Sequence, residues 1–227
     1  MDLDRALRFR DLSIDEFTIR LASAEPVPGG GSASAVTASL GAGLVAMVAQ
    51  LSAGRPKYAQ HEGLHAWAAD VGSELRDRFL VLADEDSVAY AGFAAAMKLP
   101  RDDDQAIAAR TTALQAAART ACEVPLRCVE ACLELVAAAE ALAGRSNVNA
   151  SSDLNVASLL GEAAARGAAE NVLINLPAVG DPALEGEWTG RVHDLLGEIE
   201  SIASSTREVI AQGDPRDALP DPGRART

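Results

Sequence analysis

The stretch PVPGGGSASAVTASLGAGLVAMVAQLSAG, residues 26–54, decides the fold, because no charged residue interrupts it. From residue 32 onward, small side chains recur at helical spacing, as at Ser34, Ala38, Ala42 and Ala46. On a helix this spacing forms a ridge that a second helix can approach closely. The segment is long enough to cross a bilayer, but small and hydroxyl-bearing residues dominate it and no aromatic belt flanks it. We therefore predict a buried central helix and no membrane partner.

The composition favours an all-α protein. Of the 227 residues, 48% are hydrophobic but only 4% are aromatic. Alanine, which has the highest helix propensity, supplies much of the difference. The net charge of -13 argues against a nucleic-acid partner, because phosphate backbones require clustered Lys and Arg. An anionic ligand would need a local basic group within this acidic surface.

The first ten residues, MDLDRALRFR, carry charges and lack the apolar run of a signal peptide, so we expect a cytoplasmic protein. The three cysteines, Cys122, Cys128 and Cys132, are expected to be small core residues in a reducing compartment.

Start and stop signals divide the chain into helices. Ser13 and Glu16 form a predicted capping box that opens a short helix ending near residue 24. Longer helices are expected over 32–53, 58–98, 102–143, 151–176 and 185–212. We predict one domain, residues 1–212, of five to six long antiparallel helices that forms a homodimeric bundle through the glycine-rich helix. The Pro-rich tail, residues 213–227, is predicted to be disordered.

Three consecutive glycines, Gly29, Gly30 and Gly31, precede the central helix, which we expect to be capped by Ser32. Two interpretations remain open on sequence grounds. The glycines form either a tight structural turn or a loop that exposes backbone N–H groups to an anion or a carbonyl at a helix N-terminus.

A carboxylate interrupts the apolar stripe of the third predicted helix. Apolar residues from Leu64 to Phe93 follow a spacing of three to four, and Asp86 occupies one position of that stripe. A buried carboxylate is expensive unless it is paired, so Asp86 either caps or pairs with a neighbouring element or is retained for function. Burial would raise its pKa and suit it to proton transfer near neutral pH.

Other predicted helices repeat this pattern. Arg110 lies on the stripe of the following helix, and Asp153, Asn171 and Asn175 lie on the stripe of the next. Each alone could be a satisfied core group. Together they predict a polar cavity that several helices share.

The residues HEGLH, 61–65, match the zinc-binding pattern HExxH, in which two imidazoles on one helical face hold the metal. No third ligand or adjoining sheet is evident, and Gly63 weakens the helix. We interpret the match as coincidental and expect no metal site.

Several stretches, taken in order, resemble the cyclodeaminase/cyclohydrolase family, which includes the C-terminal half of formiminotransferase-cyclodeaminase. The stretches that carry the resemblance are PVPGGGSASA, GRPKY, DEDSVAY, EVPL, SNVNASSDLNVA and RGAAENVLINL. The resemblance implies an all-helical, dimeric enzyme that handles one-carbon units on tetrahydrofolate.

The resemblance also implies roles for individual residues. Gly29, Gly30, Gly31 and Ser32 match the family's glycine loop, which is expected at the folate site. Lys57 matches a basic position suited to a substrate carboxylate. Asp86 matches an acidic position expected to act as the acid/base, and Arg110 matches a further basic position.

The remaining matches are asparagines and an aspartate. Asn147, Asn149 and Asp153 match the family's Asn-x-Asn loop, and Asn171 and Asn175 match its last asparagine pair. Ser146 departs from the family, which usually has glycine there, and this leaves the exact substrate open.

The implied reaction is either cyclodeamination of 5-formiminotetrahydrofolate or hydrolysis of 5,10-methenyltetrahydrofolate to 10-formyltetrahydrofolate. Folate is the substrate, and no permanently bound cofactor is expected. A non-catalytic helical binding or scaffold protein is the alternative, and a zinc hydrolase using His61 and His65 is a more distant one.

Overall fold

The computed structural model describes residues 8–219. Six α-helices make up these residues, with short 3-10 turns at Phe9–Asp11, Pro56–His61, Val148–Ala150 and Leu176–Val179. The helices are α1 (Ile14–Leu21), α2 (Gly30–Ser52), α3 (Glu62–Met97), α4 (Asp104–Leu142), α5 (Ser151–Asn175) and α6 (Pro182–Gln212). The predicted all-α class is confirmed.

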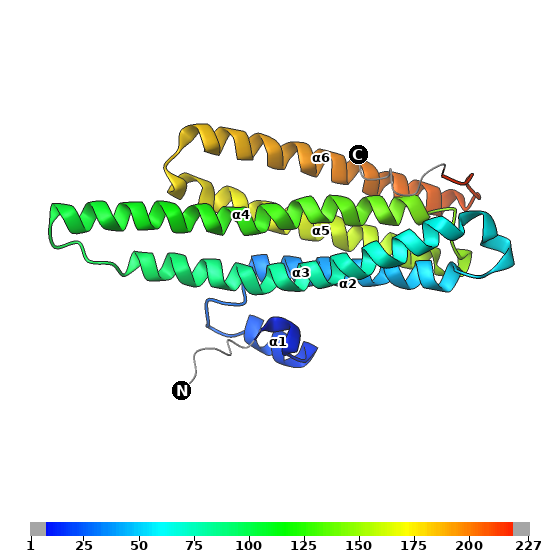
Figure 1. Cartoon of the computed structure of the whole chain (residues 1–227), viewed down its shortest axis with the longest axis horizontal. Helices are drawn as coiled ribbons and strands as arrows, with labels where there is room; N and C mark the ends of the chain where they lie inside the picture. Colours follow the sequence, from blue (N-terminus) through cyan, green and yellow to red (C-terminus); the bar gives the residue numbers. More distant parts are fainter. Residues whose placement is uncertain (1–7, 220–227) are drawn as a thin grey trace.

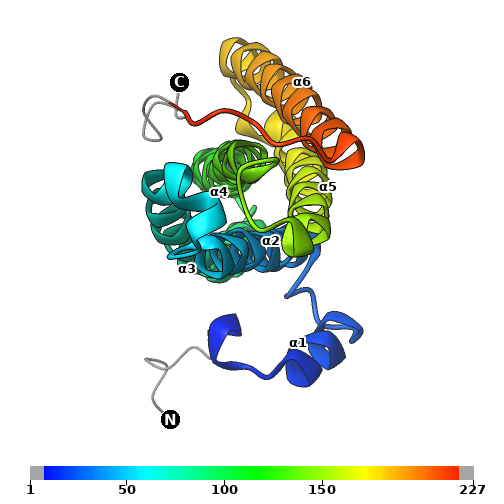
Figure 2. The ribbon, with the colours of Figure 1, turned by 90° about the vertical axis from the view of Figure 1, so that its right-hand side faces the viewer.

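Helices α2 to α5 form an elongated bundle, and α6 covers α4 and α5 on the side away from α2 (Figures 1 and 2). The burial predicted for the uncharged segment holds for the faces of α2 that pack against α3 and α5, whereas its remaining face, with Leu40, Met47 and Leu51, is exposed. At one end α3 and α4 continue well beyond the first residue of α2 (Figure 1). Because α2 is shorter, space for a site remains between α3 and α4 beyond its N-terminus.

Small residues let the helices approach closely. A Cβ added at Gly72 of α3 would lie 2.7 Å from the backbone nitrogen of Ala46 and 2.9 Å from the carbonyl oxygen of Ala42. On the other side of α2, a Cβ at Gly41 would lie 3.1 Å from the carbonyl oxygen of Ala157. The ridge of small residues in α2 therefore sets the spacing of the bundle.

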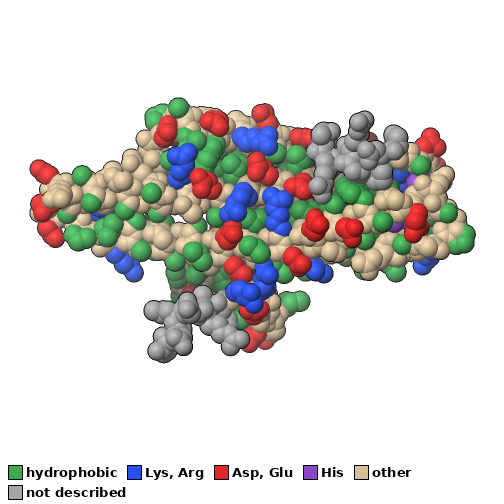
Figure 3. All heavy atoms as spheres, in the orientation of Figure 1, with side chains coloured by type: hydrophobic (Ala, Val, Ile, Leu, Met, Phe, Trp, Pro, Cys, Tyr) green, Lys and Arg blue, Asp and Glu red, His purple; other side chains and the backbone are tan. Residues whose placement is uncertain are grey.

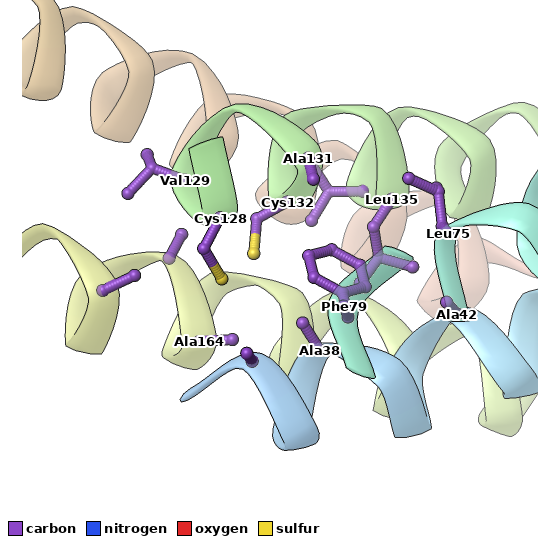
Figure 4. Close-up of a cluster of buried hydrophobic side chains, with 14 of the residues drawn as sticks. Ala38, Ala42, Leu75, Phe79, Cys128, Val129, Ala131, Cys132, Leu135 and Ala164 are labelled. Carbon is purple, nitrogen blue, oxygen red and sulfur yellow. The ribbon is translucent and has the colours of Figure 1, made fainter. Parts of the chain in front are cut away.

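The core is built from these alanines and a few larger side chains. Phe79 projects from α3 between Ala38 of α2 and Leu135 of α4, with Cys128 and Cys132 nearby (Figure 4). All three cysteines are buried and unpaired, as the sequence predicts. Burial raises the pKa of Cys122 to about 12, so this thiol is unreactive.

Two apolar residues, one in α4 and one in α5, are exposed. Ile107 is 48% and Ile174 is 78% exposed. Ile107 lies in the first turn of α4. The start of α4 belongs to the part of the α3–α4 hairpin that extends beyond the other helices (Figure 1). Apolar side chains are also scattered among charges on the face shown in Figure 3.

The N-terminal arm contacts the bundle through Phe9 and Arg10, and Arg10 also donates to the carbonyl oxygen of Asp77. α1 is separated from α2 and α3 in both ribbon views (Figures 1 and 2). The predicted capping box at Ser13 and Glu16 is present. The backbone N–H of Phe9 donates to Asp84 over 2.7 Å, and Arg10 pairs with the same carboxylate at 3.6 Å. Asp84 therefore anchors the arm to α3.

Residues 213–219 of the predicted disordered tail lie against the domain. The backbone N–H of Arg216 donates to the carbonyl of Gly144, and Leu219 packs at the edge of the core. The Arg145 guanidinium donates to the carbonyl oxygen of Asp217 over 2.6 Å. The ordered chain thus extends past residue 212, and the rest of the predicted tail, 220–227, lies outside the described residues.

One helix, α2, has the length and hydropathy of a membrane span, but 56% of its most apolar window is buried inside the bundle. The core helix of a water-soluble protein meets the same description.

The close approach of α2 and α3 predicts that Gly72→Ala destabilises the protein. The added methyl must push against the backbone of α2, which costs about 1–3 kcal/mol in a packed core. Gly197→Ala in α6 is the control, because a Cβ there meets nothing within 4 Å. We expect it to stabilise α6 by roughly 0.5–1 kcal/mol. Chemical denaturation measures both, and an unchanged Gly72→Ala variant would contradict the packing described here.

Candidate active site

A cavity of about 300 Å³ lies beyond the N-terminus of α2, between α3, α4 and α5. Helix α2 begins at Gly30, two residues before the predicted start, and Gly29 is its N-cap without a side-chain cap. The cavity is lined by the three glycines, by Pro26 and Val27 of the loop before α2, and by residues of α3, α4 and α5: Asp86, Ala89, Tyr90, Phe93, Ala121, Asn171 and Asn175.

Asp86 and Ser32 meet at this cavity. The Ser32 hydroxyl is buried and lies 2.8 Å from Oδ2 of Asp86 and 3.2 Å from the carbonyl oxygen of Ala83. Ser32 is therefore not the helix cap that the sequence predicts, because its side chain points toward α3 and holds the carboxylate. Asp86 itself is half-buried at the cavity wall.

The absence of a side chain at Gly31 leaves the space that the Asp86 carboxylate occupies. A Cβ at Gly31 would overlap Oδ1 of Asp86 and lie 2.6 Å from the carboxyl carbon. Gly30 is less constrained, because a Cβ there would lie 3.5 Å from the Asn171 amide nitrogen, an ordinary contact. Gly29 has extended backbone that any residue can adopt. The glycine run thus serves close approach rather than an unusual backbone conformation.

Burial raises the pKa of Asp86, and hydrogen bonds from the Ser32 side chain and backbone oppose the rise. A serine hydroxyl has one proton, so it donates either to Asp86 or to the carbonyl of Ala83. When Asp86 is protonated, Ser32 can donate to Ala83 and accept from the carboxyl group. Both protonation states of Asp86 therefore keep a hydrogen bond to Ser32.

Asn171 and Asn175 line the same cavity from α5. Their side-chain NH₂ groups each donate over 2.8 Å to a backbone carbonyl one turn earlier, at Gly167 and Asn171. Within residues 8–219, neither amide oxygen accepts a hydrogen bond. These oxygens can accept hydrogen bonds from N–H groups of a ligand.

Arg110 does not join this cluster. Its guanidinium donates to the carbonyl oxygen of Met97 over 3.1 Å, where it closes the turn between α3 and α4. The residue lies about three helical turns from Ala121, the α4 residue in the cavity. Among the described residues that line the cavity there is no Lys, Arg or His, and Asp86 is the only charged side chain.

The other predicted residues lie at the opposite end of α2. Lys57 follows α2 and is exposed, as is Asn149, and Asp153 is half-buried in the first turn of α5. Asn147 is buried and supports the loop, because its backbone N–H donates to Ser52 and its side chain accepts from the N–H of Asn149. Within one chain, the predicted site residues therefore fall into two separate groups, one near each end of α2.

A second cavity, of about 290 Å³, lies at this end beside Lys57, Tyr58, His61 and Ser146. His61 and His65 are both buried, and His65 Nε2 lies 2.9 Å from the carbonyl oxygen of Arg145. No three His, Cys, Asp or Glu side chains within residues 8–219 are arranged to hold a metal ion. The His65 ring packs edge-on against Tyr58, and the His61 and His65 rings lie 6.2 Å apart, centroid to centroid.

Sequence reasoning missed Tyr90 and Arg145. Tyr90 lines the first cavity one helical turn after Asp86, and its position in DEDSVAY was the available signal. Arg145 is only 6% exposed and joins the loop to the tail, with its pKa lowered by burial and by Arg216. No pattern of spacing marks such a role.

Comparison with known proteins agrees with this architecture. The family model described as formiminotransferase-cyclodeaminase matches residues 13–194. A methenyltetrahydrofolate cyclohydrolase of Methylorubrum extorquens is 34% identical over 198 residues, which cover 87% of this chain and 95% of that protein. A formimidoyltransferase-cyclodeaminase of Rattus norvegicus is 34% identical over 202 residues, but the chain spans only 36% of it.

A solved structure shares the fold. The formiminotetrahydrofolate cyclodeaminase of Thermotoga maritima superposes with a TM-score of 0.81 at 25% identity, over 89% of this chain and 98% of that one. The bundle and its carboxylate-bearing cavity define an all-helical protein of the cyclodeaminase type. The chain belongs to the formiminotransferase-cyclodeaminase family.

The Ser32 contact predicts that Ser32→Ala raises the pKa of Asp86 further, because it removes a hydrogen bond that favours the charged form. Titration of the Asp86 carboxyl carbon by NMR measures the shift. Ser34→Ala is the control, since the Ser34 hydroxyl donates to the Gly30 carbonyl and not to the carboxylate. Equal Asp86 pKa values in the wild type and Ser32→Ala would contradict the assigned hydrogen bond.

Proposed function

We propose that this protein is an enzyme that acts on one-carbon units carried by tetrahydrofolate. The observation that carries the proposal is Asp86, a half-buried carboxylate with a raised pKa beside the N-terminus of α2. Two relatives that match over nearly their whole length are named for the two reactions of this class, a cyclohydrolase and a cyclodeaminase.

Both reactions pass through a tetrahedral carbon and require a proton to move. In hydrolysis, water adds to the methenyl carbon and the ring opens to 10-formyltetrahydrofolate. In cyclodeamination, N10 attacks the formimino carbon and ammonia leaves. Asp86 takes the proton from the attacking group and returns it to the departing nitrogen, while Ser32 bonds to either form of the carboxyl group.

The charge of the site suits the substrate. The methenyl group is a cation, and an ionised carboxylate held in a sheltered cavity stabilises a cation more strongly than water does. Asn171 and Asn175 offer amide oxygens to the N–H groups of the pterin ring. As proposed, the reaction needs the folate alone and no permanently bound cofactor. The three free cysteines suit the cytoplasm, where we place the enzyme.

The proposal predicts that Asp86→Asn reduces turnover by about 10²–10⁴-fold, the usual contribution of a positioned general acid/base. Absorbance of the methenyl chromophore follows the reaction, and circular dichroism confirms that the variant is folded. Glu85→Gln is the matched control, because Glu85 is the adjacent carboxylate and pairs with Arg127 outside the cavity. Full activity in folded Asp86→Asn would refute the assignment.

The same assay separates the two reactions. A cyclodeaminase generates the methenyl chromophore from 5-formiminotetrahydrofolate, whereas a cyclohydrolase removes the chromophore of 5,10-methenyltetrahydrofolate. Absence of both activities from the wild-type protein would favour a non-catalytic folate-binding role.

We also propose that the enzyme is a homodimer that pairs through the outer face of α2. Leu40, Met47 and Leu51 on this face are 57%, 37% and 42% exposed, and no charged residue lies between Gly30 and Ser52. An uncharged helical face of this length is typical of a protein interface.

This interface predicts that Leu40→Arg converts the dimer to a monomer, because a guanidinium would be buried without a partner. Sedimentation velocity measures the mass of each species. Leu99→Arg is the control, since Leu99 is 40% exposed at the α3–α4 turn and not on α2. A wild-type monomer, or a Leu40→Arg dimer, would contradict this assignment.

A further inference from the structure

We propose that the C-terminal segment 213–219, which we call the strap, is a releasable element that holds the α4–α5 loop, residues 143–150, against one end of the bundle. Release of the strap opens this loop and makes the second cavity accessible to small molecules. The strap lies beyond residue 194, where the match to the family model ends. The inference goes beyond the proposed folate function and does not depend on the chemistry at Asp86.

The strap is bound to both the loop and the last turns of α4. Gly213, with a φ of 73°, ends α6, and Figure 2 shows the strap, in red, crossing from there toward α4. The backbone N–H of Arg216 donates to the carbonyl oxygen of Gly144 over 2.9 Å. The Arg216 guanidinium donates to the carbonyl oxygen of Glu140 over 3.1 Å and pairs with the carboxylate of the same residue at 2.8 Å.

The fit of the strap depends on Gly144. This residue has a φ of 72°, in the left-handed region that favours glycine. A Cβ there would also lie 2.9 Å from Cγ of Arg216 and 2.9 Å from the carbonyl oxygen of Asp214. The strap therefore packs against a part of the loop that must remain free of side chains.

Arg145 joins the strap to the interior. Its Nε donates to the carbonyl oxygen of Asp217 over 2.6 Å, and its Nη1 donates to that of Ala141 over 3.0 Å. Burial and the neighbouring Arg216 lower its pKa, and no carboxylate within residues 8–219 forms an ion pair with it. Because a buried guanidinium without a carboxylate partner is costly, the closed strap gains little net stability from this residue.

Little apolar burial supports the strap. Only Arg216 and Leu219 of its seven residues are half-buried, and the other five are exposed. Leu219 packs at the edge of the core. Segments with few buried apolar contacts open at a low free energy while the rest of a fold stays intact. The strap therefore opens more readily than the helices beneath it.

The closed strap forms one wall of the second cavity. Gly213, Asp214 and Pro215 line this cavity. Ser146 and Val148 of the loop line it as well, and Ser146 is only 7% exposed. Release of the strap removes a wall of the cavity and frees the loop, so the Ser146 side chain becomes accessible.

The inner side of the loop contacts the buried imidazoles. The carbonyl oxygen of Arg145 lies 2.9 Å from Nε2 of His65, and the N–H of Val148 donates to the Tyr58 hydroxyl over 3.1 Å. Arg145 thus contacts His65 through its carbonyl and the strap through its guanidinium. Movement of the strap is therefore expected to disturb the surroundings of His65 and of His61, which lines the same cavity.

A cysteine in place of Ser146 reports on this opening. The three native cysteines are buried, so the introduced thiol is the accessible one. In the full-length Ser146→Cys chain we expect slow labelling by a fluorescent maleimide. Adding Arg145→Met or Arg216→Met removes charged hydrogen bonds to the strap or loop, and we expect labelling to accelerate at least about tenfold. Circular dichroism confirms that each variant is folded.

Two controls accompany these variants in the Ser146→Cys chain. Arg207→Met breaks an ion pair between α6 and Glu162 outside the strap, and we expect it to leave labelling unchanged. Gly144→Ala and Gly54→Ala are a matched pair, because both positions have positive φ, 72° and 68°. Only at Gly144 does the added Cβ meet the strap, so we expect faster labelling in Gly144→Ala alone.

Hydrogen exchange separates release of the strap from general loosening. In Arg216→Met, which leaves the interior unchanged, we expect amides of residues 143–150 and 213–219 to exchange at least about tenfold faster, with no change in the centres of α2 and α5. Unchanged labelling and exchange in both arginine variants would overturn the inference. An equal rise in exchange throughout the bundle would also overturn it, because the strap would then not open separately.

Discussion

The close packing of α2 against α3 is the constraint on which the rest of the structure depends. Gly72 lets the backbones of the two helices meet, and Gly31 lets the first turn of α2 lie against the Asp86 carboxylate. The first contact sets the spacing of the bundle and the second sets the geometry of the cavity. A larger side chain at Gly72 would push against the backbone of α2, and one at Gly31 would displace the Asp86 carboxylate.

This arrangement explains how an acidic, alanine-rich chain can hold the half-buried carboxylate that we propose as the acid/base. Burial raises the pKa of Asp86, while Ser32 keeps its hydrogen bonding satisfied in both protonation states. The group is thereby available for proton transfer without the cost of an unpaired buried charge. The proposed chemistry on a cationic methenyl group uses both protonation states, because the ionised form stabilises the cation and accepts a proton, and the protonated form returns that proton to the departing nitrogen.

Much of the fold could be predicted from the sequence because its signals are local. The capping box at Ser13, the apolar stripe of α3 and the uncharged α2 all have fixed spacing. Exposure of Ile107 could not be predicted, because it depends on α3 and α4 extending beyond the other helices. The site is predicted less well: the polar stripes place Asp86, Asn171 and Asn175 together, whereas Lys57 is assigned to them by resemblance and lies beyond the opposite end of α2.

The most direct measurement is a crystal structure of the protein with 5-formyltetrahydrofolate, a stable folate that carries a one-carbon group. We expect the pterin in the first cavity, with the formyl carbon beside Asp86. Density for the ligand only in the second cavity, beside His61 and away from Asp86, would contradict the proposed site.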